Sequence, residues 1–141
     1  MSNDGYAGDV SPQQAYALLQ TDAEAVLVDV RTLPEWQYVG LPDLSALDKR
    51  PVLLSWQDYP TMAVRSDFPE ALAAAGVPKQ APVLLICRSG IRSQAAAQAL
   101  TAAGYTKAFN VSEGFEGPLD GAQHRGQAGG WKAAGLPWLQ K

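Results

Sequence analysis

Four short and nearly uninterrupted runs of apolar residues stand out along the chain. They cover residues 25–30, 52–54, 83–86 and 108–111, and the last is the weakest. None shows the alternation of apolar and polar positions that marks a strand with one face in water. Runs of this length without alternation are typical of strands covered on both faces, as in parallel sheets. The pattern therefore predicts four buried strands.

Helical segments lie before and between these runs. Ser11 and Pro12 precede the first one, with serine suited to the N-cap and proline to the first helical position. A second segment covers residues 67–75 and ends at Gly76, where a left-handed residue without a side chain commonly closes a helix. Both sets of end signals predict helices that begin and stop at defined residues.

A third helical segment covers residues 92–103 and ends at Gly104. It is dominated by alanine, the best helix former. Small apolar residues at helical spacing predict the face that packs on the sheet: Ala95, Ala96, Ala99, Leu100 and Ala103. Strands alternating with helices predict an α/β fold, a single domain with a mostly parallel central sheet and helices on both faces.

Length and charge narrow the possible classes of protein. With 141 residues the chain suits one domain, residues 1–141, in which we expect residues 1–8 to be flexible and residues 117–130 to form a glycine-rich loop. A net charge of −3 argues against a nucleic-acid partner, which would need a basic stripe. No stretch approaches the ~20 apolar residues of a membrane span, and the first residues lack the pattern of a signal peptide. A single cysteine forms no internal disulfide and suits a reducing cytoplasm. The pattern does not indicate an oligomeric state.

The carboxyl ends of the predicted strands carry the candidate chemistry, because ligands bind beyond those ends in open parallel sheets. The segments found there are Asp29–Arg31, Ser55–Gln57, Cys87–Gly90 and Ser112–Phe115. If the strands are parallel, these segments share one edge of the sheet, and the only thiol of the chain lies among them. We expect Trp56 to line the pocket at this edge.

The position of Cys87 favours a reactive thiolate. A cysteine just before a helix faces unpaired N–H groups and the positive end of the helix dipole, and both favour the charged form. Gly90 allows the backbone to turn so that successive N–H groups point inward as an anion-binding nest. A lone cysteine at a strand end is more often a small buried hydrophobic residue. The residues that follow it favour a nucleophile instead.

Those residues add positive charge and hydrogen-bond donors. Arg88 and Arg92 carry planar guanidinium groups that suit oxyanions. Ser89 and Ser93 can donate hydroxyl hydrogen bonds or cap the helix. The segment from Cys87 to Ser93 therefore predicts a nucleophile beside a cradle for an anion.

The segment Cys87-Arg88-Ser89-Gly90-Ile91-Arg92-Ser93 resembles the active-site loop of rhodanese-type sulfurtransferases. Weaker similarities cover nearly the whole chain in the order that this family shows: Leu27–Arg31 with Glu35, Trp36 and Gly40; Val111–Phe115 with Gly117; and Trp131-Lys132 through Leu136-Pro137. The chain departs from the family after Gly40, where many members continue with His-Ile-Pro-Gly-Ala and this one has Leu41-Pro42-Asp43-Leu44. The departure affects a local turn and leaves the cysteine loop intact.

The resemblance implies a rhodanese-like domain that transfers sulfur in two steps. Cys87 would take the outer sulfur of an anionic donor such as thiosulfate, become a persulfide, and pass the sulfur to a thiol, to cyanide or to a protein. Loop N–H groups and residues Arg88 to Ser93 would hold the anion, with no metal and no organic cofactor. Asp29 and Arg31 would either support the loop or form a structural ion pair. His124, the only histidine, is expected to be a loop residue that is either solvated or bonded to a backbone group.

Two other functions stay open. Related cysteine-based phosphatases and arsenate reductases use Cys-x5-Arg, whereas Arg92 follows Cys87 here as Cys-x4-Arg, which leaves a smaller cradle. No general acid for a phosphoester leaving group is evident. A non-catalytic rhodanese-type binding module is the other possibility, although such modules commonly lack the cysteine.

Overall fold

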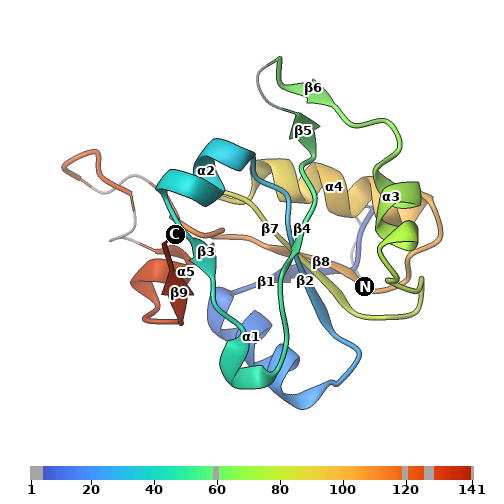
Figure 1. Cartoon of the computed structure of the whole chain (residues 1–141), viewed down its shortest axis with the longest axis horizontal. Coiled ribbons are helices and arrows are strands. Elements are labelled where there is room, and N and C mark those ends of the chain that lie inside the picture. The colour runs from blue at the N-terminus through green and yellow to red at the C-terminus, as the bar shows by residue number, and fades with distance from the viewer. Residues whose placement is uncertain (1–4, 59–60, 119–120, 126–128, 141) are drawn as a thin grey trace.

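A computed structural model describes residues 5–58, 61–118, 121–125 and 129–140. Five parallel strands form the central sheet in the order β1-β8-β7-β2-β4 (Figure 1). Their bounds are β1 Gly8–Val10, β2 Val26–Asp29, β4 Val52–Leu53, β7 Val83–Ile86 and β8 Ala108–Val111. The four apolar runs are confirmed as strands, and the parallel sheet is confirmed with them. The edge strand β1 was not predicted.

Helices and short strands complete the fold. The helices are α1 Pro12–Thr21, α2 Leu33–Tyr38, α3 Phe68–Ala74, α4 Ile91–Ala102 and α5 Gly130–Ala133, with a 3-10 turn η1 at Ser45–Leu47. Two antiparallel pairs lie outside the main sheet: β3 Leu41–Pro42 with β9 Trp138–Leu139, and β5 Gln57–Asp58 with β6 Ala63–Val64.

The sheet separates two apolar cores, because alternate residues of each strand point to opposite faces. Along β7, Val83 and Leu85 belong to the core beneath α3 and α4. Leu84 and Ile86 belong to the core on the other face, which α1 and α5 cover. Helices therefore lie on both faces of the sheet, as predicted. Cys87, directly after β7, belongs to the core on the α4 side.

The predicted helix ends are confirmed. The Ser11 hydroxyl accepts a hydrogen bond from the Gln14 amide at 3.0 Å, and the Gln14 side chain accepts one from the Ser11 amide at 2.8 Å. This reciprocal pair satisfies two backbone donors at the start of α1. Gly76 and Gly104 follow α3 and α4 with φ of +94° and +105°, which a residue without a Cβ adopts most readily.

The buried face of α4 differs in part from the predicted one. Ala96 and Leu100 are fully buried as expected, but Ser93 and Ala97 share that face with them. The remaining predicted members, Ala95, Ala99 and Ala103, are only half-buried. The difference arises because the polar Ser93 faces the sheet, and a prediction from apolar positions alone does not count a serine as buried. Relative to the predicted face, the observed buried face of α4 is therefore shifted around the helix toward Ser93.

Several outer segments bear on earlier expectations. Residues 1–4 of the expected flexible stretch lie outside the described residues, whereas Tyr6 is buried and Gly8 opens β1.

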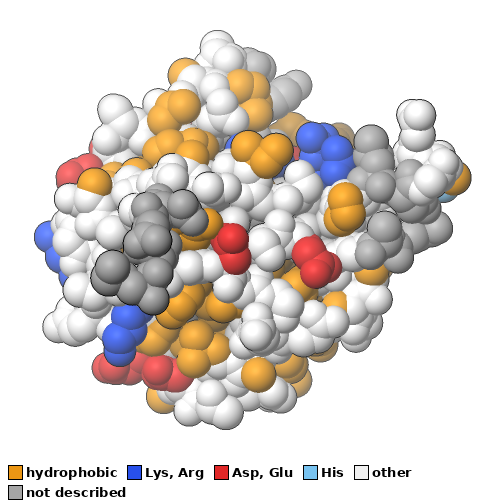
Figure 2. Space-filling view, turned by 180° about the vertical axis from the view of Figure 1, so that it is seen from behind, with side chains coloured by type: hydrophobic (Ala, Val, Ile, Leu, Met, Phe, Trp, Pro, Cys, Tyr) orange, Lys and Arg blue, Asp and Glu red, His pale blue; other side chains and the backbone are white. Residues whose placement is uncertain are grey.

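Within the described residues, no helix combines the length and apolar character needed to cross a membrane. On the face shown in Figure 2, a few basic and acidic side chains are scattered among apolar and uncharged ones. That face carries a mixed surface.

Candidate active site

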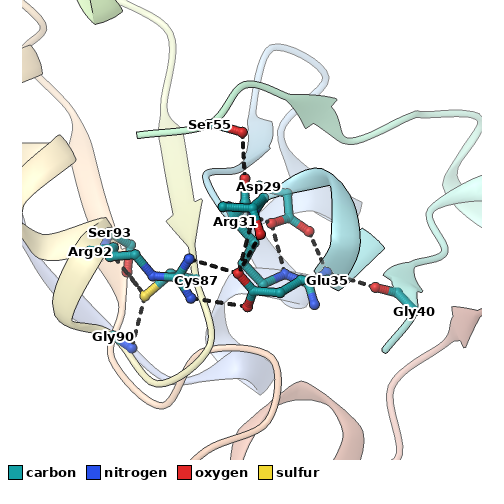
Figure 3. A network of polar contacts seen from close by, with 10 residues as sticks. Asp29, Arg31, Glu35, Gly40, Ser55, Cys87, Gly90, Arg92 and Ser93 are labelled. Atoms are coloured by element: carbon teal, nitrogen blue, oxygen red, sulfur yellow. Dashed lines mark hydrogen bonds and ion pairs between the residues drawn. The ribbon is translucent and has the colours of Figure 1, made fainter. Parts of the chain in front are cut away.

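The loop between β7 and α4 directs three hydrogen-bond donors at one sulfur atom. We refer to residues 87–93 as the cysteine loop. The Sγ atom of Cys87 accepts hydrogen bonds from the amide of Gly90 at 3.1 Å and the amide of Ser93 at 3.4 Å. The Ser93 hydroxyl lies 3.2 Å from the same atom (Figure 3). Such donors stabilise negative charge on sulfur more than they stabilise a neutral thiol.

The turn that produces this arrangement depends on Gly90. Its φ is +106° and it immediately precedes α4, so its amide points back toward the sulfur. A Cβ at this position would stand 2.2 Å from the carbonyl oxygen of Ser112. Glycine is therefore required here both for the backbone angle and for the close approach of the segment after β8.

That neighbouring segment is bonded directly to the backbone of the cysteine loop. The Phe115 amide donates to the carbonyl of Cys87 at 2.8 Å, and the Glu116 amide donates to that of Arg88 at 3.0 Å. At Gly114, whose φ is +66°, a Cβ would lie 2.6 Å from the Cys87 carbonyl oxygen. The carboxyl ends of β7 and β8 thus support each other, as the sharing of one sheet edge predicted.

The guanidinium of Arg92 faces Glu35 of α2. Its Nη1 and Nη2 atoms donate to the two carboxylate oxygens of Glu35 at 2.8 and 3.0 Å (Figure 3). Both side chains are less than one-fifth exposed. The amide and hydroxyl of Thr32 also donate to Glu35, at 3.3 and 3.1 Å. The sequence predicted that Arg92 binds an anion, whereas in the structure its planar fork is occupied by a carboxylate of this chain.

The ion pair shifts the pKa of both partners. Burial alone would raise the pKa of Glu35, but hydrogen bonds from Arg92 and its positive charge, together with Thr32, lower it below the ordinary value of 4.5. Burial alone would lower the pKa of Arg92, but Glu35 and the charges of Cys87 and Asp29 raise it. Both groups therefore stay charged near neutral pH, and α2 is held to the start of α4.

A small pocket leads to the sulfur. It has a volume of about 170 Å³, and its lining is formed by Cys87, Arg88, Ser89, Ile91 and Arg92. Cys87 is only 1% exposed, so its side chain lies below the surface. At the rim Ile91 is 78% exposed and Arg88 is also exposed. Among the described residues Arg88 has no ion-pair partner, so its charge is available to an anion.

A wider depression adjoins this pocket, since Arg88 and Arg92 line both. Its volume is about 440 Å³, and its other lining residues are Glu35, Val39, Gln57, Met62, Glu116 and Arg125. Side chains of both charge signs therefore surround the approach to the cysteine loop. Glu35 is already paired with Arg92, and three arginines against two glutamates give the lining a net positive charge, which favours an anion.

Asp29 and Arg31 form a buried ion pair. Both side chains are 0% exposed, and the Nε and Nη2 atoms of Arg31 donate to the two Asp29 oxygens at 2.9 and 2.7 Å. The same Nη2 donates to the carbonyl of Gly40 at 2.8 Å, and the guanidinium lies 4.3 Å from the centre of the Phe115 ring. These contacts fit the structural alternative, in which the pair joins β2 to the chain after α2.

Neither Trp56 nor His124 is among the residues that line the two pockets at the cysteine loop. The Trp56 ring packs edge-on against Phe68, with ring centres 5.4 Å apart, and its neighbour Gln57 lines the wider depression instead. His124 is exposed in the glycine-rich loop. Parts of that loop, residues 119–120 and 126–128, lie outside the described residues.

Two residues near the site were missed as site residues by the sequence analysis. Glu35 was named only within the family resemblance, and Asn110 only as part of a strand. Thr32 three positions before Glu35 has the spacing of an N-terminal capping pair, which could have located α2 but not its contact with Arg92. The Asn110 side chain, 3% exposed, accepts a hydrogen bond from the Ser93 hydroxyl at 2.5 Å. A polar residue within an apolar run was the available signal.

Comparison with known proteins shows clear similarities over nearly the whole chain. The family described as the STR4 middle domain matches residues 7–141. The crystal structure of Rv0390 from M. tuberculosis is similar with a TM-score of 0.87 and 46% identity, covering 96% of this chain and 99% of that one. An uncharacterized protein of Rickettsia conorii, RC0915, is 38% identical over 131 residues, 92% of this chain and 95% of its own. The thiosulfate sulfurtransferase GlpE of Pseudomonas savastanoi pv. phaseolicola is 33% identical over 107 residues, 76% and 82% of the two chains.

Proposed function

Because the chain belongs to the rhodanese-like domain family, we propose that it transfers sulfane sulfur through a persulfide on Cys87. The observation that carries this proposal is the convergence of the Gly90 amide, the Ser93 amide and the Ser93 hydroxyl on one sulfur atom. Preorganised donors stabilise charge that would otherwise need a shell of water. A cysteine serving only to pack the core would not require them.

The proposed reaction has two half-reactions that balance without a cofactor. In the first, the Cys87 thiolate attacks the outer sulfur of thiosulfate, the S–S bond of the donor breaks, and sulfite leaves with the electron pair. In the second, a nucleophilic acceptor attacks the outer sulfur of the persulfide, and Cys87 leaves as a thiolate. This is covalent catalysis, in which one transfer becomes two simpler displacements.

The surroundings of Cys87 assign roles to its neighbours. Arg88 is exposed at the pocket rim and would attract an anionic donor. The Gly90 and Ser93 donors would hold the Cys87 sulfur whenever it is charged, before the first step and after the second. Arg92 would act through Glu35 by fixing α2 beside the pocket. The donor class we propose is a thiosulfate-like anion, and the acceptor is a thiol, cyanide or a protein in the cytoplasm.

The two other functions have less support. In a cysteine-based phosphatase the arginine of the loop must meet the substrate, but both ends of the Arg92 fork bind Glu35. A pocket of about 170 Å³ with Arg92 so engaged suits a terminal sulfur better than a tetrahedral oxyanion held by that arginine. A purely non-catalytic module would gain nothing from donors aimed at a sulfur atom.

Mass spectrometry of the intact protein tests the proposal. After treatment with thiosulfate, the wild type should gain the mass of one sulfur atom, and cyanide should remove it with formation of thiocyanate. The Cys87→Ser variant should gain none. A folded wild type that takes up no sulfur from thiosulfate, persulfides or polysulfide would contradict the sulfurtransferase function, and turnover of an aryl phosphate would favour the phosphatase.

A further inference from the structure

A chain of buried side chains leads from the sulfur of Cys87 to the edge strand of the sheet. The Ser93 hydroxyl lies 3.2 Å from Cys87 Sγ and 2.5 Å from Asn110 Oδ1. The Nδ2 atom of Asn110 donates to Asp9 Oδ1 at 3.0 Å. Ser93 and Asn110 are buried, whereas Asp9 of β1 is exposed. The chain thus passes from α4 through β8 to β1.

The Ser93 hydroxyl has one hydrogen and two acceptors within reach. It can donate to the Cys87 sulfur or to the Asn110 carbonyl, but not fully to both. The orientation of the Asn110 amide is not free, because a carboxylate at Asp9 only accepts and therefore holds the NH₂ end. The carbonyl end of Asn110 must then face Ser93 and compete with the sulfur for the hydroxyl hydrogen.

We infer that Asn110 and Asp9 are positioning residues that set how strongly the Ser93 hydroxyl binds the sulfur of Cys87. The part of this inference that concerns sulfur transfer rests on the proposed function. The competition between Cys87 Sγ and Asn110 Oδ1 for the hydroxyl hydrogen follows from the contacts alone. When Sγ carries negative charge, the hydroxyl donates to it. When Sγ is a thiol or the inner atom of a persulfide, the hydroxyl donates to Asn110. The Ser93 hydroxyl and the Asn110 carbonyl then both keep a hydrogen-bond partner.

The two half-reactions use this exchange in opposite directions. Charge leaves Sγ as the thiolate attacks the donor, and the hydroxyl returns to Asn110. Charge comes back to Sγ as the acceptor removes the outer sulfur, and the hydroxyl returns to Sγ. Because the hydroxyl keeps a partner in both charge states, the Asn110 acceptor lowers the extra stabilisation that the hydroxyl gives the thiolate in both half-reactions.

Removal of the competing acceptor gives a measurable signature. In Asn110→Ala the hydroxyl has only the sulfur to bind, so the ratio of thiolate to thiol, followed by the ultraviolet absorbance of the thiolate at fixed pH, should rise about tenfold. A better stabilised thiolate is a weaker nucleophile and a better leaving group. Sulfur uptake per thiolate should therefore slow in single turnovers, while delivery from the preformed persulfide should quicken.

Variants of Asp9 test the orienting role. Since Asp9 Oδ1 also accepts a hydrogen bond from the hydroxyl of the buried Tyr6 at 2.7 Å, urea denaturation first shows that each variant is folded. Asp9→Ala frees the Asn110 amide to turn its NH₂ end toward Ser93, and should shift the thiolate ratio in the same direction as Asn110→Ala. Asp9→Asn keeps an acceptor for Asn110 and should restore the wild-type ratio. As a matched control, Tyr105→Phe removes another buried hydrogen bond, 2.8 Å to the Val77 carbonyl, and should leave the ratio unchanged.

The double variant Ser93→Ala with Asn110→Ala gives the deciding comparison. It should behave as Ser93→Ala alone, because without the hydroxyl Asn110 has no route to the sulfur. An unchanged or reduced thiolate ratio in folded Asn110→Ala, or an equal effect of Asn110→Ala with and without Ser93, would overturn the inference. The absorbance needs no sulfur donor, so failure of the wild type to form a persulfide would count against the proposed function and not against this competition.

Discussion

Gly90→Ala is the substitution that the structure predicts to be most damaging for its size. It adds one methyl group at a residue whose φ is +106°. That methyl would stand 2.2 Å from the Ser112 carbonyl oxygen and 2.9 Å from its carbonyl carbon. Both atoms belong to the backbone after β8, which is itself bonded to the cysteine loop, so they cannot move aside as a flexible side chain would.

Two contributions to the cost can be separated. Placing a Cβ on a left-handed backbone costs about 1–2 kcal/mol wherever it occurs. The clash with Ser112 adds to this, since either the loop or the segment after β8 must shift. A shift of the loop moves the Gly90 amide away from the Cys87 sulfur, so a hydrogen bond to the charged thiolate is lost and less of the cysteine is in the reactive form. We therefore expect a stability loss above about 2 kcal/mol and a transfer rate at a fixed pH reduced about ten- to a hundredfold.

Gly76→Ala is the matched control. Gly76 has a φ of +94°, follows α3, and a Cβ there would meet nothing within 4 Å. Urea denaturation of both variants gives their free energies of unfolding, and single-turnover persulfide formation with thiosulfate gives the rate. Gly76→Ala should lose only the backbone cost and keep the wild-type rate. If Gly90→Ala is no less stable than Gly76→Ala, or if it transfers sulfur at the wild-type rate, the argument from close approach is wrong.

Three further predictions concern charged residues. Arg31→Ala should cost about 3–5 kcal/mol in urea denaturation, because Asp29 would be left as a buried charge without its partner; a loss below 1 kcal/mol would contradict this. Glu35→Gln should destabilise the protein at neutral pH by breaking the pair with Arg92. Since the pKa of Glu35 is lowered in the folded protein, its contribution is present above its ordinary value of 4.5 and is lost as the pH falls below that value, so the difference in stability from wild type should shrink there. Arg88→Gln should raise the KM for thiosulfate about three- to tenfold and weaken its salt dependence; an unchanged KM would remove Arg88 from donor binding.

The fold was largely predictable because its main strands are covered on both faces. Strands β2 and β7 lie inside the sheet with helices on either side, so their residues are apolar without alternation. Strand β1 escaped prediction because Gly8, Asp9 and Val10 form no apolar run, and the strand owes its pairing to β8 rather than to its own composition.

The site was predictable where its contacts are local. Gly90 and Ser93 lie within six positions of Cys87, and a strand followed by a glycine turn and a helix defines their geometry. Glu35 lies 57 positions from Arg92, and Asn110 lies 17 positions from Ser93. Such contacts depend on how α2 packs beside α4 and on which strand lies next to β7. Spacing along one sequence contains neither piece of information.

The depth of the sulfur has a consequence for selectivity among sulfur compounds. A pocket of about 170 Å³ has room for roughly five or six water molecules, at about 30 Å³ each. A sulfur atom at the end of a small molecule can enter such a space and meet Cys87 head-on. The inner sulfurs of a disulfide between two bulky groups present themselves sideways and stay at the rim. The recessed position of Cys87 therefore favours terminal sulfur atoms over the inner sulfurs of a disulfide between bulky groups.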